Sequence, residues 1–488
     1  MKTHRAVIIL LSIICSFFSL SCSTTEPSLN KSPTCEIIQP PNNALISLGN
    51  IVEIAVNASD SDGQIVHVKF FIDDELRHID YESPYGYTWD TSEDRYGVHV
   101  IRAEAVDDEA YSESCKVTVT ISWSYHQPKQ VNDGWETASL ESVGLDSTLL
   151  ISLMNNLNST ENHLIHGIII IKNNRLVFEE YFKGLTHPTW GETPVTFNRK
   201  RMHVLSSVAK SITATLVGIA IEKGFIPSVD AKVFDFYPEL ADLNIGQKQE
   251  ITLRHLLTMS SGLGWDEQSF PLTDPRNDLT KFISIALHSN DDLARFILEM
   301  EMTATPGKVF NYSGGNYNLL GDIIQRASGI RLDEFAKDYL FEPLSVQESW
   351  WWLLRPDFVY ASGDLALRLR DLAKVGQLFL QHGVWNGAQI IPEEWITLSS
   401  TPVFLFSPPD WSLSYGHRGY SFGWWPSLES YGEGAFAASG WGGQTLAILP
   451  EHDMVIVITG GYYWDAPYLT YHQIINQYIL PSIQYRLY

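Results

Sequence analysis

The sequence predicts a multidomain protein, in which a small all-β sandwich precedes a larger α+β domain with an antiparallel sheet flanked by helices. Two observations predict this fold class. The chain has 488 residues, which is more than one hydrophobic core of ordinary size organises. Short runs with a two-residue period come first, and helical periods between strong apolar strands come later. Hydrophobic residues make up 44% and charged residues 18%, as in globular proteins.

The charge balance excludes some partners. The chain carries 57 acidic and 33 basic residues, for a formal net charge of -24. A field of this sign repels nucleic acid and anionic membrane surfaces. We therefore expect no nucleic-acid partner, and contact with a membrane through a lipid anchor alone.

Residues 1–22 are typical of a signal peptide of the lipoprotein type. Lys2 and Arg5 precede an apolar run that ends at Cys22. The end of this run resembles a bacterial lipobox, although Ser19 stands where leucine is usual. The resemblance implies that Cys22 is acylated and anchors the protein; the alternative is a plain signal peptide. Both predict export to the periplasm or cell envelope, and residues 23–34 form a polar tether.

Residues 35–122 contain six or seven short strands separated by turn residues, which predicts a small β-sandwich. The segment resembles the immunoglobulin-like modules of secreted bacterial enzymes, and its partner is not indicated. Cys35 and Cys115 fall in its first and last strands, where they form either a disulfide or two buried free thiols. The acidic loop 60–63 is more typical of a solvated turn than of a calcium site.

Residues 123–137 have no clear period and are interpreted as a linker to the domain at 138–488. A hairpin with Asn173-Asn174 as its turn opens this domain, and a second hairpin lies near its end. Helices are expected between the two hairpins and after the second one, over the stretches 207–223, 275–300, 316–328, 365–383, 393–400 and 467–480. Strands at both ends predict one sheet assembled from the two termini of the domain.

The strongest chemical signal is Ser207-Val208-Ala209-Lys210. Ser207 opens a nearly all-apolar helix, whose free N–H groups favour developing negative charge. Lys210 lies one turn further on the same face, where a buried amine must be paired or neutral. A neutral lysine can take a proton from a neighbouring hydroxyl. The alternative is a capping serine beside a lysine that extends to solvent.

A rival nucleophile is Ser421, which lies in the Gly-x-Ser-x-Gly pattern of 419–423. The nucleophile elbow of α/β-hydrolases needs a helix directly after the serine, whereas two tryptophans and a proline follow here. We therefore interpret this stretch as a strand. The sequence contains no metal-binding motif, so neither a metal nor another cofactor is expected.

Tyr312, in a glycine-containing loop before a helix, completes a familiar set with Ser207 and Lys210. The order and spacing resemble the serine β-lactamase and penicillin-binding-protein superfamily, in its class C and esterase branch. The resemblance covers about residues 135–488 and includes the framework segments 251–263, 371–387 and 420–425. His255 lies in the first of these segments and is expected to be structural.

Two positions depart from the superfamily pattern. The tyrosine motif, usually Tyr-x-Asn, ends here in Gly314, and the third motif, usually Lys-Thr-Gly or His-x-Gly, begins with Ala438. The superfamily uses those two positions to hold the amide and the carboxylate of β-lactams. The sequence is more similar to the branch of 6-aminohexanoate-oligomer hydrolases and esterases.

The resemblance implies an exported serine hydrolase that cleaves a small ester or amide through an acyl-enzyme on Ser207. Lys210 and Tyr312 would transfer protons, and the backbone N–H groups of Ser207 and Trp441 would hold the oxyanion. Ser439 and Gly440 would border the substrate. The alternatives are a β-lactamase, a D-amino-acid peptidase, or a non-catalytic envelope binding protein on the same scaffold.

Overall fold

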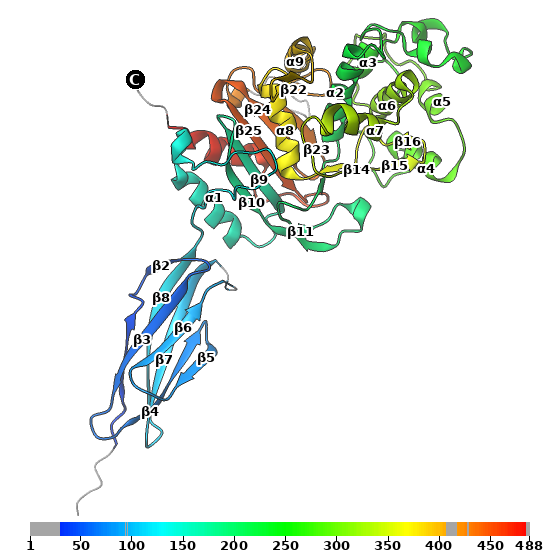
Figure 1. Ribbon diagram of the computed structural model, residues 1–488. Helices are drawn as coiled ribbons and strands as arrows, with labels where there is room; N and C mark the ends of the chain where they lie inside the picture. Colours follow the sequence, from blue (N-terminus) through cyan, green and yellow to red (C-terminus); the bar gives the residue numbers. More distant parts are fainter. Residues whose placement is uncertain (1–29, 93, 95, 407–416, 427–428, 485–488) are drawn as a thin grey trace, which may run out of the picture. The chain divides into compact units, whose positions relative to one another are not determined.

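The computed structural model describes residues 30–484, apart from residues 93, 95, 407–416 and 427–428 (Figure 1). Cys22, the expected site of lipidation, lies outside the described residues. The chain divides into two compact units between Ser122 and Trp123. Within the described residues, no helix is long and apolar enough to cross a membrane.

The first unit contains two β-sheets, which confirms the predicted sandwich. One sheet has the order β1-β3-β6, with strands Thr34–Gln39, Ile51–Ser59 and Tyr85–Asp90. The other has the order β2-β8-β7-β4-β5, with strands Ala44–Ser47, Ser112–Ser122, Gly97–Asp107, Ile65–Ile72 and Glu75–Asp80. Alternate residues of β4 (Val68, Phe70 and Ile72) are buried, as the two-residue period requires.

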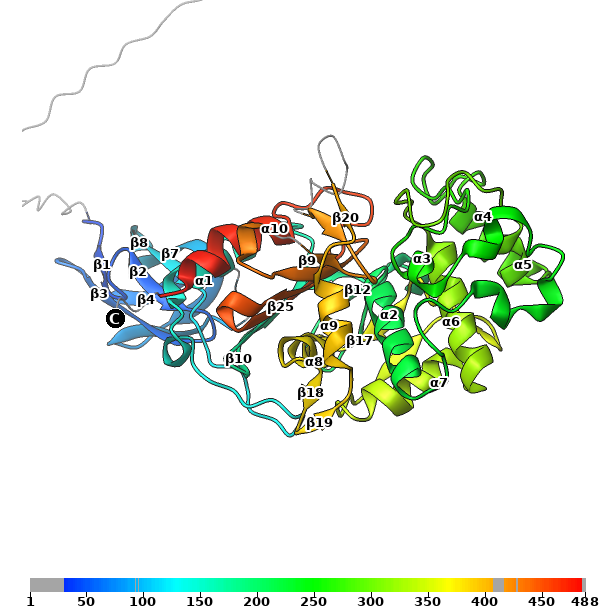
Figure 2. The ribbon, with the colours of Figure 1, turned by 90° about the horizontal axis from the view of Figure 1, so that it is seen from above.

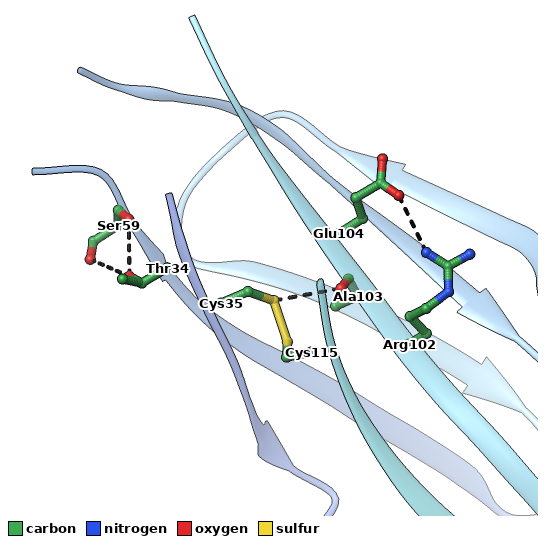
Figure 3. Close-up of a disulfide and its surroundings, with 7 residues drawn as sticks. All are labelled: Thr34, Cys35, Ser59, Arg102, Ala103, Glu104 and Cys115. Carbon is green, nitrogen blue, oxygen red and sulfur yellow. Dashed lines mark hydrogen bonds and ion pairs between the residues drawn. A yellow bond between two sulfur atoms is a disulfide. The ribbon is translucent and has the colours of Figure 1, made fainter. Parts of the chain in front are cut away.

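A disulfide joins the two sheets of this unit (Figure 3). Cys35 lies on β1, opposite Ala58 of β3, and Cys115 lies on β8, opposite Ala103 of β7. The two Cα atoms are 5.5 Å apart, and 80 residues separate the cysteines in sequence. The bond therefore closes a large loop across the core of the sandwich.

The second unit is built on a six-stranded antiparallel sheet with the order β10-β9-β25-β24-β23-β22. Its strands are Arg175–Tyr181, Ile165–Lys172, Met454–Gly460, Gln444–Leu449, Phe436–Gly440 and Trp425–Pro426. The central pairing joins β9, from the beginning of the unit, to β25, from its end, with Ile169 opposite Val457. The expected sheet made from both ends of the domain is thus confirmed.

Helices lie on both faces of this sheet (Figure 2). On one face, α8 (Leu369–Leu380) packs on β9, β24 and β25. On the other, α1 (Ser147–Ser159) packs against the C-terminal segment, which contains α10 (Tyr471–Ile474) and a π-helical turn (Ile475–Ile479). The sheet is therefore a buried middle layer, and its β9 segment 165–171 is buried along its whole length.

The remaining helices form a separate layer around α2 (Val208–Glu222), which packs against α6 (Gly314–Ser328). Around them lie α3 (Leu253–Leu257), α4 (Asp278–His288), α5 (Leu293–Leu298), α7 (Leu332–Ala336) and α9 (Glu393–Ser400). The helical stretch expected at 275–300 is two helices. The chain breaks between them because Asp292 accepts hydrogen bonds from the backbone of Ala294 and Arg295 and starts a new helix.

The segment 123–137, which we expected to be a linker, packs on the second unit. The Trp135 side chain is 2% exposed, and its indole N–H donates to the carbonyl of Arg370 at 3.0 Å. The Arg370 guanidinium, itself buried, pairs with Asp133 at 2.8 Å and with Glu179. A buried aromatic ring and a buried ion pair thus hold this segment as an integral part of the domain.

Candidate active site

The site is organised at the N-terminus of α2. The short strand β13 (His203–Val204) pairs with β17 (Leu365–Leu367) and leads into the helix through Ser206. Ser206 has φ of 48°, a left-handed conformation that is strained for a non-glycine residue. This tight turn places the partly exposed Ser207 at the N-cap position, where the helix has unpaired N–H groups and a positive dipole end.

Lys210 contacts the hydroxyl of Ser207 directly. Its Nζ atom lies 3.1 Å from Ser207 Oγ and donates a hydrogen bond to the carbonyl of Ser362 at 2.8 Å. The lysine side chain is 3% exposed, so it does not extend to solvent as the structural alternative required. A neutral amine in this position can receive the proton of the serine hydroxyl when the oxygen attacks a carbonyl.

Tyr312 lies beside the same amine. Lys210 Nζ is 4.9 Å from the centroid of the Tyr312 ring, and this ring stacks on Trp425 at 6.2 Å. Asn311 fixes the loop, because its backbone N–H donates to Met259 and its side chain donates to Trp265. The structure therefore brings together the three predicted catalytic side chains.

The third motif lies at the end of β23, against the backbone of Leu205 and Ser207. A Cβ atom at Gly440 would lie 2.3 Å from the carbonyl oxygen of Leu205 and 3.1 Å from the amide nitrogen of Ser207. Glycine is needed here because the strand approaches the turn before α2 this closely. Trp441 follows directly, and Ser439 Oγ lies 3.5 Å from the hydroxyl of Tyr471.

Sequence reasoning missed two buried carboxyl groups close to Lys210. Glu267 accepts hydrogen bonds from the indole N–H of Trp265 at 2.6 Å and from the backbone N–H of Gly314 at 2.8 Å. Burial raises the pKa of Glu267, and the charge of Lys210 opposes that rise. Its position depends on the folding of a loop far from the Ser-x-x-K motif, so no local pattern could have identified it.

Asp364 is the second carboxyl group. It accepts a hydrogen bond from the hydroxyl of Thr189 at 2.7 Å and lies 3.9 Å from Nε2 of His187. Burial raises the pKa of Asp364 to about 6, although Thr189 and Lys210 favour its charged form. Asp364 directly precedes β17, whose pairing with β13 brings it to the start of α2.

The geometry explains the glycine at the third position of the tyrosine motif. A Cβ atom at Gly314 would lie 2.8 Å from Glu267 Oε2 and 3.2 Å from Ser362 Oγ. An asparagine side chain has no room there while Glu267 stays in place. The carboxylate of Glu267 thus occupies the region that the motif amide would need.

The rival nucleophile Ser421 is buried. Its side chain is 0% exposed, and its hydroxyl donates to the carbonyl of Leu398 at 2.6 Å. His255 is structural, because its Nδ1 accepts a hydrogen bond from the backbone N–H of Thr252 and so caps α3. Across the described part of the chain, no group of three or more His, Cys, Asp or Glu side chains is placed to hold a metal ion.

The α+β fold, with its sheet between helices, and the Ser/Lys/Tyr set are typical of the serine hydrolase family with the β-lactamase fold. The model of the Beta-lactamase family matches residues 166–462, more than half of the chain, and the chain belongs to this family. The model of a bacterial Ig domain matches residues 33–103 of the first unit. Both matches agree with the resemblances that the sequence motifs indicated.

Individual relatives are distant. The 6-aminohexanoate-dimer hydrolase of Paenarthrobacter ureafaciens is 25% identical over 264 residues, which are 52% of this chain and 65%, just under two thirds, of that protein. A putative 6-aminohexanoate-dimer hydrolase from Bacillus anthracis superposes with a TM-score of 0.54 at 22% identity, over 73% of this chain and 90% of that one. A putative β-lactamase from Bacteroides dorei superposes with a TM-score of 0.52 at 19% identity, over 65% and 91%. The two structural matches show a shared fold.

Proposed function

We propose that this protein hydrolyses a small ester or amide through an acyl-enzyme on Ser207. The observation that carries the proposal is the 3.1 Å contact between Lys210 Nζ and Ser207 Oγ at the N-terminus of a buried helix. The similarity to a 6-aminohexanoate-dimer hydrolase supports an amide or ester substrate. A binding protein on this scaffold would need neither a nucleophile nor a buried lysine beside it.

In the proposed mechanism, Ser207 Oγ attacks the substrate carbonyl while its proton passes to the Lys210 and Tyr312 pair. The oxyanion is held by the backbone N–H groups of Ser207 and Trp441. Collapse of the tetrahedral intermediate breaks the bond to the leaving group, which takes the proton back from the same pair. Water then repeats the sequence on the acyl-enzyme and releases the acid and free Ser207.

The test is turnover of p-nitrophenyl acetate or butyrate by the purified protein. We expect Ser207→Ala to abolish turnover, and Lys210→Ala and Tyr312→Phe to reduce it by about 10²-fold or more. Ser421→Ala, the matched control, should leave it unchanged. A fluorophosphonate probe should label the wild type and not Ser207→Ala. Turnover that persists unchanged in Ser207→Ala would reject the mechanism, and absence of both turnover and labelling would favour a binding protein.

We also propose that β-lactams and D-amino-acid peptides that carry a carboxylate are poor substrates. Gly314 and Ala438 cannot supply the amide and the cation that hold these molecules in related enzymes. Each missing contact is worth about 1.5–3 kcal/mol, so acylation should be slower by about two to four orders of magnitude. Efficient hydrolysis of nitrocefin would contradict this specificity and leave the nucleophile in place.

We propose that the protein is exported and lipid-anchored through Cys22. The basic and apolar N-terminal segment supports export, and a disulfide in the first unit suits an oxidising compartment. Cys22→Ser, or treatment with globomycin, should release the protein from the membrane fraction. If Cys22→Ser stays entirely in the membrane fraction, lipidation is not the anchor.

A further inference from the structure

Four aromatic rings form a compact group beside the nucleophile, which we call the aromatic wall: His187, Trp441, Tyr463 and Trp464. Trp441 lies at its centre, with ring centroids 5.0 Å from Tyr463, 5.1 Å from Trp464 and 5.8 Å from His187. Every one of these contacts is close to edge-to-face, with interplanar angles from 63° to 88°. The rings therefore support one another in fixed orientations.

The aromatic wall is attached to the catalytic centre at two points. His187 Nδ1 lies 2.8 Å from the hydroxyl oxygen and 3.2 Å from the backbone nitrogen of Thr189, and its Nε2 lies 3.3 Å from the hydroxyl of Ser206. Trp441 follows Gly440, where an added Cβ atom would lie 3.1 Å from the amide nitrogen of Ser207. A group joined to the reacting carbonyl therefore lies within reach of these rings.

Two carboxylates lie beside the wall, and the charge of Lys210 acts on one of them, Asp364. Glu192 accepts the indole N–H of Trp464 at 2.6 Å, and Asp364 lies 3.9 Å from Nε2 of His187. Burial, followed by the charges of Asp364 and Glu192, holds the pKa of the Tyr463 hydroxyl above its ordinary range. Burial lowers the pKa of His187 to about 4, so this ring is neutral at physiological pH and adds no positive charge.

We propose that the aromatic wall binds an organic cation of the trimethylammonium type. The cation is part of the substrate and belongs to either its acyl group or its leaving group. Aromatic faces attract such cations, and the nearby carboxylates add to the attraction. Trp464 is 60% exposed, so its ring is available to a ligand. A neutral aliphatic group would gain nothing from Glu192 and Asp364, and an anion would be repelled. The inference rests on the proposed function, because it places the cation on the substrate of Ser207.

The binding test uses Ser207→Ala and needs no turnover. Choline and 3,3-dimethylbutan-1-ol have the same shape and differ in charge at one atom. We expect choline to quench tryptophan fluorescence saturably and to bind at least about tenfold more tightly than the neutral alcohol. Equal affinities, or no binding of choline at concentrations that saturate weak sites, would overturn the proposal.

Variants locate the subsite. Trp464→Leu and Glu192→Gln should each reduce the preference for choline over the alcohol by about threefold to tenfold. The matched controls Trp350→Leu and Glu393→Gln carry the same exchanges outside the aromatic wall, and should keep the preference. A preference that survives both wall variants would overturn the assignment to these residues.

Hydrolysis of matched cationic and neutral esters tests the cation subsite separately from the proposed hydrolase function. Acetylcholine is compared with 3,3-dimethylbutyl acetate, and p-nitrophenyl 4-(trimethylammonio)butyrate with p-nitrophenyl 5,5-dimethylhexanoate. We expect the cationic member of one pair to have the higher kcat/KM, by about tenfold, and that pair identifies which side of the carbonyl faces the wall. Hydrolysis of both members at equal rates would reject the cation subsite and keep the hydrolase. Choline binding without any hydrolysis would reject the hydrolase and keep the subsite.

Discussion

At the residue scale, Gly314 stands where the usual tyrosine motif has asparagine, and the carboxylate of Glu267 lies beside it. The glycine starts α6, and its backbone N–H donates to Glu267. The carboxylate is fixed by that bond and by Trp265, so it cannot move aside without losing both partners. The two positions therefore constrain each other.

Gly314→Asn should destabilise the protein and should not create β-lactamase activity. The new Cβ would lie 2.8 Å from Glu267 Oε2, and overpacking of this kind costs about 1–3 kcal/mol. Urea unfolding followed by tryptophan fluorescence measures the loss, and nitrocefin reports the activity. Adding Glu267→Ala should recover part of the stability, because it empties the contested space. A fully stable single variant would contradict the clash.

Asp364→Asn should change stability in a pH-dependent way. Burial raises the pKa of Asp364 from 3.8 to about 6, so the folded state binds this proton more tightly than the unfolded state. The stability from protonation is complete below about pH 4 and is lost as pH rises through 6. The ionised carboxylate thus destabilises the fold by up to about 3 kcal/mol at pH 7.5, and the neutral amide avoids this loss.

Urea unfolding of wild type and Asp364→Asn at pH 4.5 and pH 7.5 measures this difference. The variant should gain stability relative to wild type between the two pH values. Asp278→Asn serves as the matched control, since it replaces another largely buried aspartate of the same domain. A difference between wild type and Asp364→Asn that does not depend on pH would contradict the assignment.

At the scale of elements, α8 lies unusually close to the central sheet. A Cβ atom at Gly376 would lie 2.5 Å from Val455 Cγ1 and 2.7 Å from Leu446 Cδ1. On a solvent-exposed helix face, replacing glycine by alanine stabilises the helix by about 1 kcal/mol. At Gly376, the close approach of α8 to the sheet makes the same exchange destabilising.

Gly376→Ala is therefore expected to lower the free energy of unfolding by about 1–3 kcal/mol. In a Val455→Ala background, the same exchange should be neutral or stabilising, because the shorter side chain makes room for the methyl group. Both effects can be measured by urea unfolding. A stable Gly376→Ala single variant would show that α8 shifts away from the sheet at little cost.

The sequence could predict those helices and strands whose apolar pattern and end residues lie within one continuous stretch of the chain. The two long hairpins have strong apolar runs and turn residues, and α2 has its motif and its apolar face within one stretch. The Ser207, Lys210 and Tyr312 set was indicated by its resemblance to a known superfamily, because no one of these motifs is specific by itself. Strands of two or three residues, such as β13 and β17, are too short to show a period. Asp364 depends on their pairing, so its place near Lys210 could not be foreseen.

At the scale of the whole molecule, the folded second unit begins earlier than the sequence suggested. We expect a fragment of residues 123–488 to fold and to show the ester turnover proposed for the full chain, because it retains Trp135 and the Asp133–Arg370 pair. A fragment of residues 138–488 should unfold at lower urea concentration. Loss of the buried Trp135 ring alone is worth about 3–5 kcal/mol.

The matched comparison is Trp135→Ala in the full chain, which removes the ring and keeps every backbone bond. It should account for most of the difference between the two fragments. Equal stability of the two fragments would mean that residues 123–137 contact the domain without contributing to its free energy of unfolding.

The pairing of β9 with β25 also sets the order in which parts of the second unit can fold during synthesis. During synthesis, Ser207 and its helix emerge long before β23, β24 and β25. Until then β9 has a partner on one edge alone, and Ser207 lacks the neighbouring strand end that carries Gly440 and Trp441. Pairing across so many residues is slow, because a long stretch of chain must be closed first. A nascent chain therefore carries Ser207 without the strand end that lies beside it, and the site is assembled only after β25 has been synthesised.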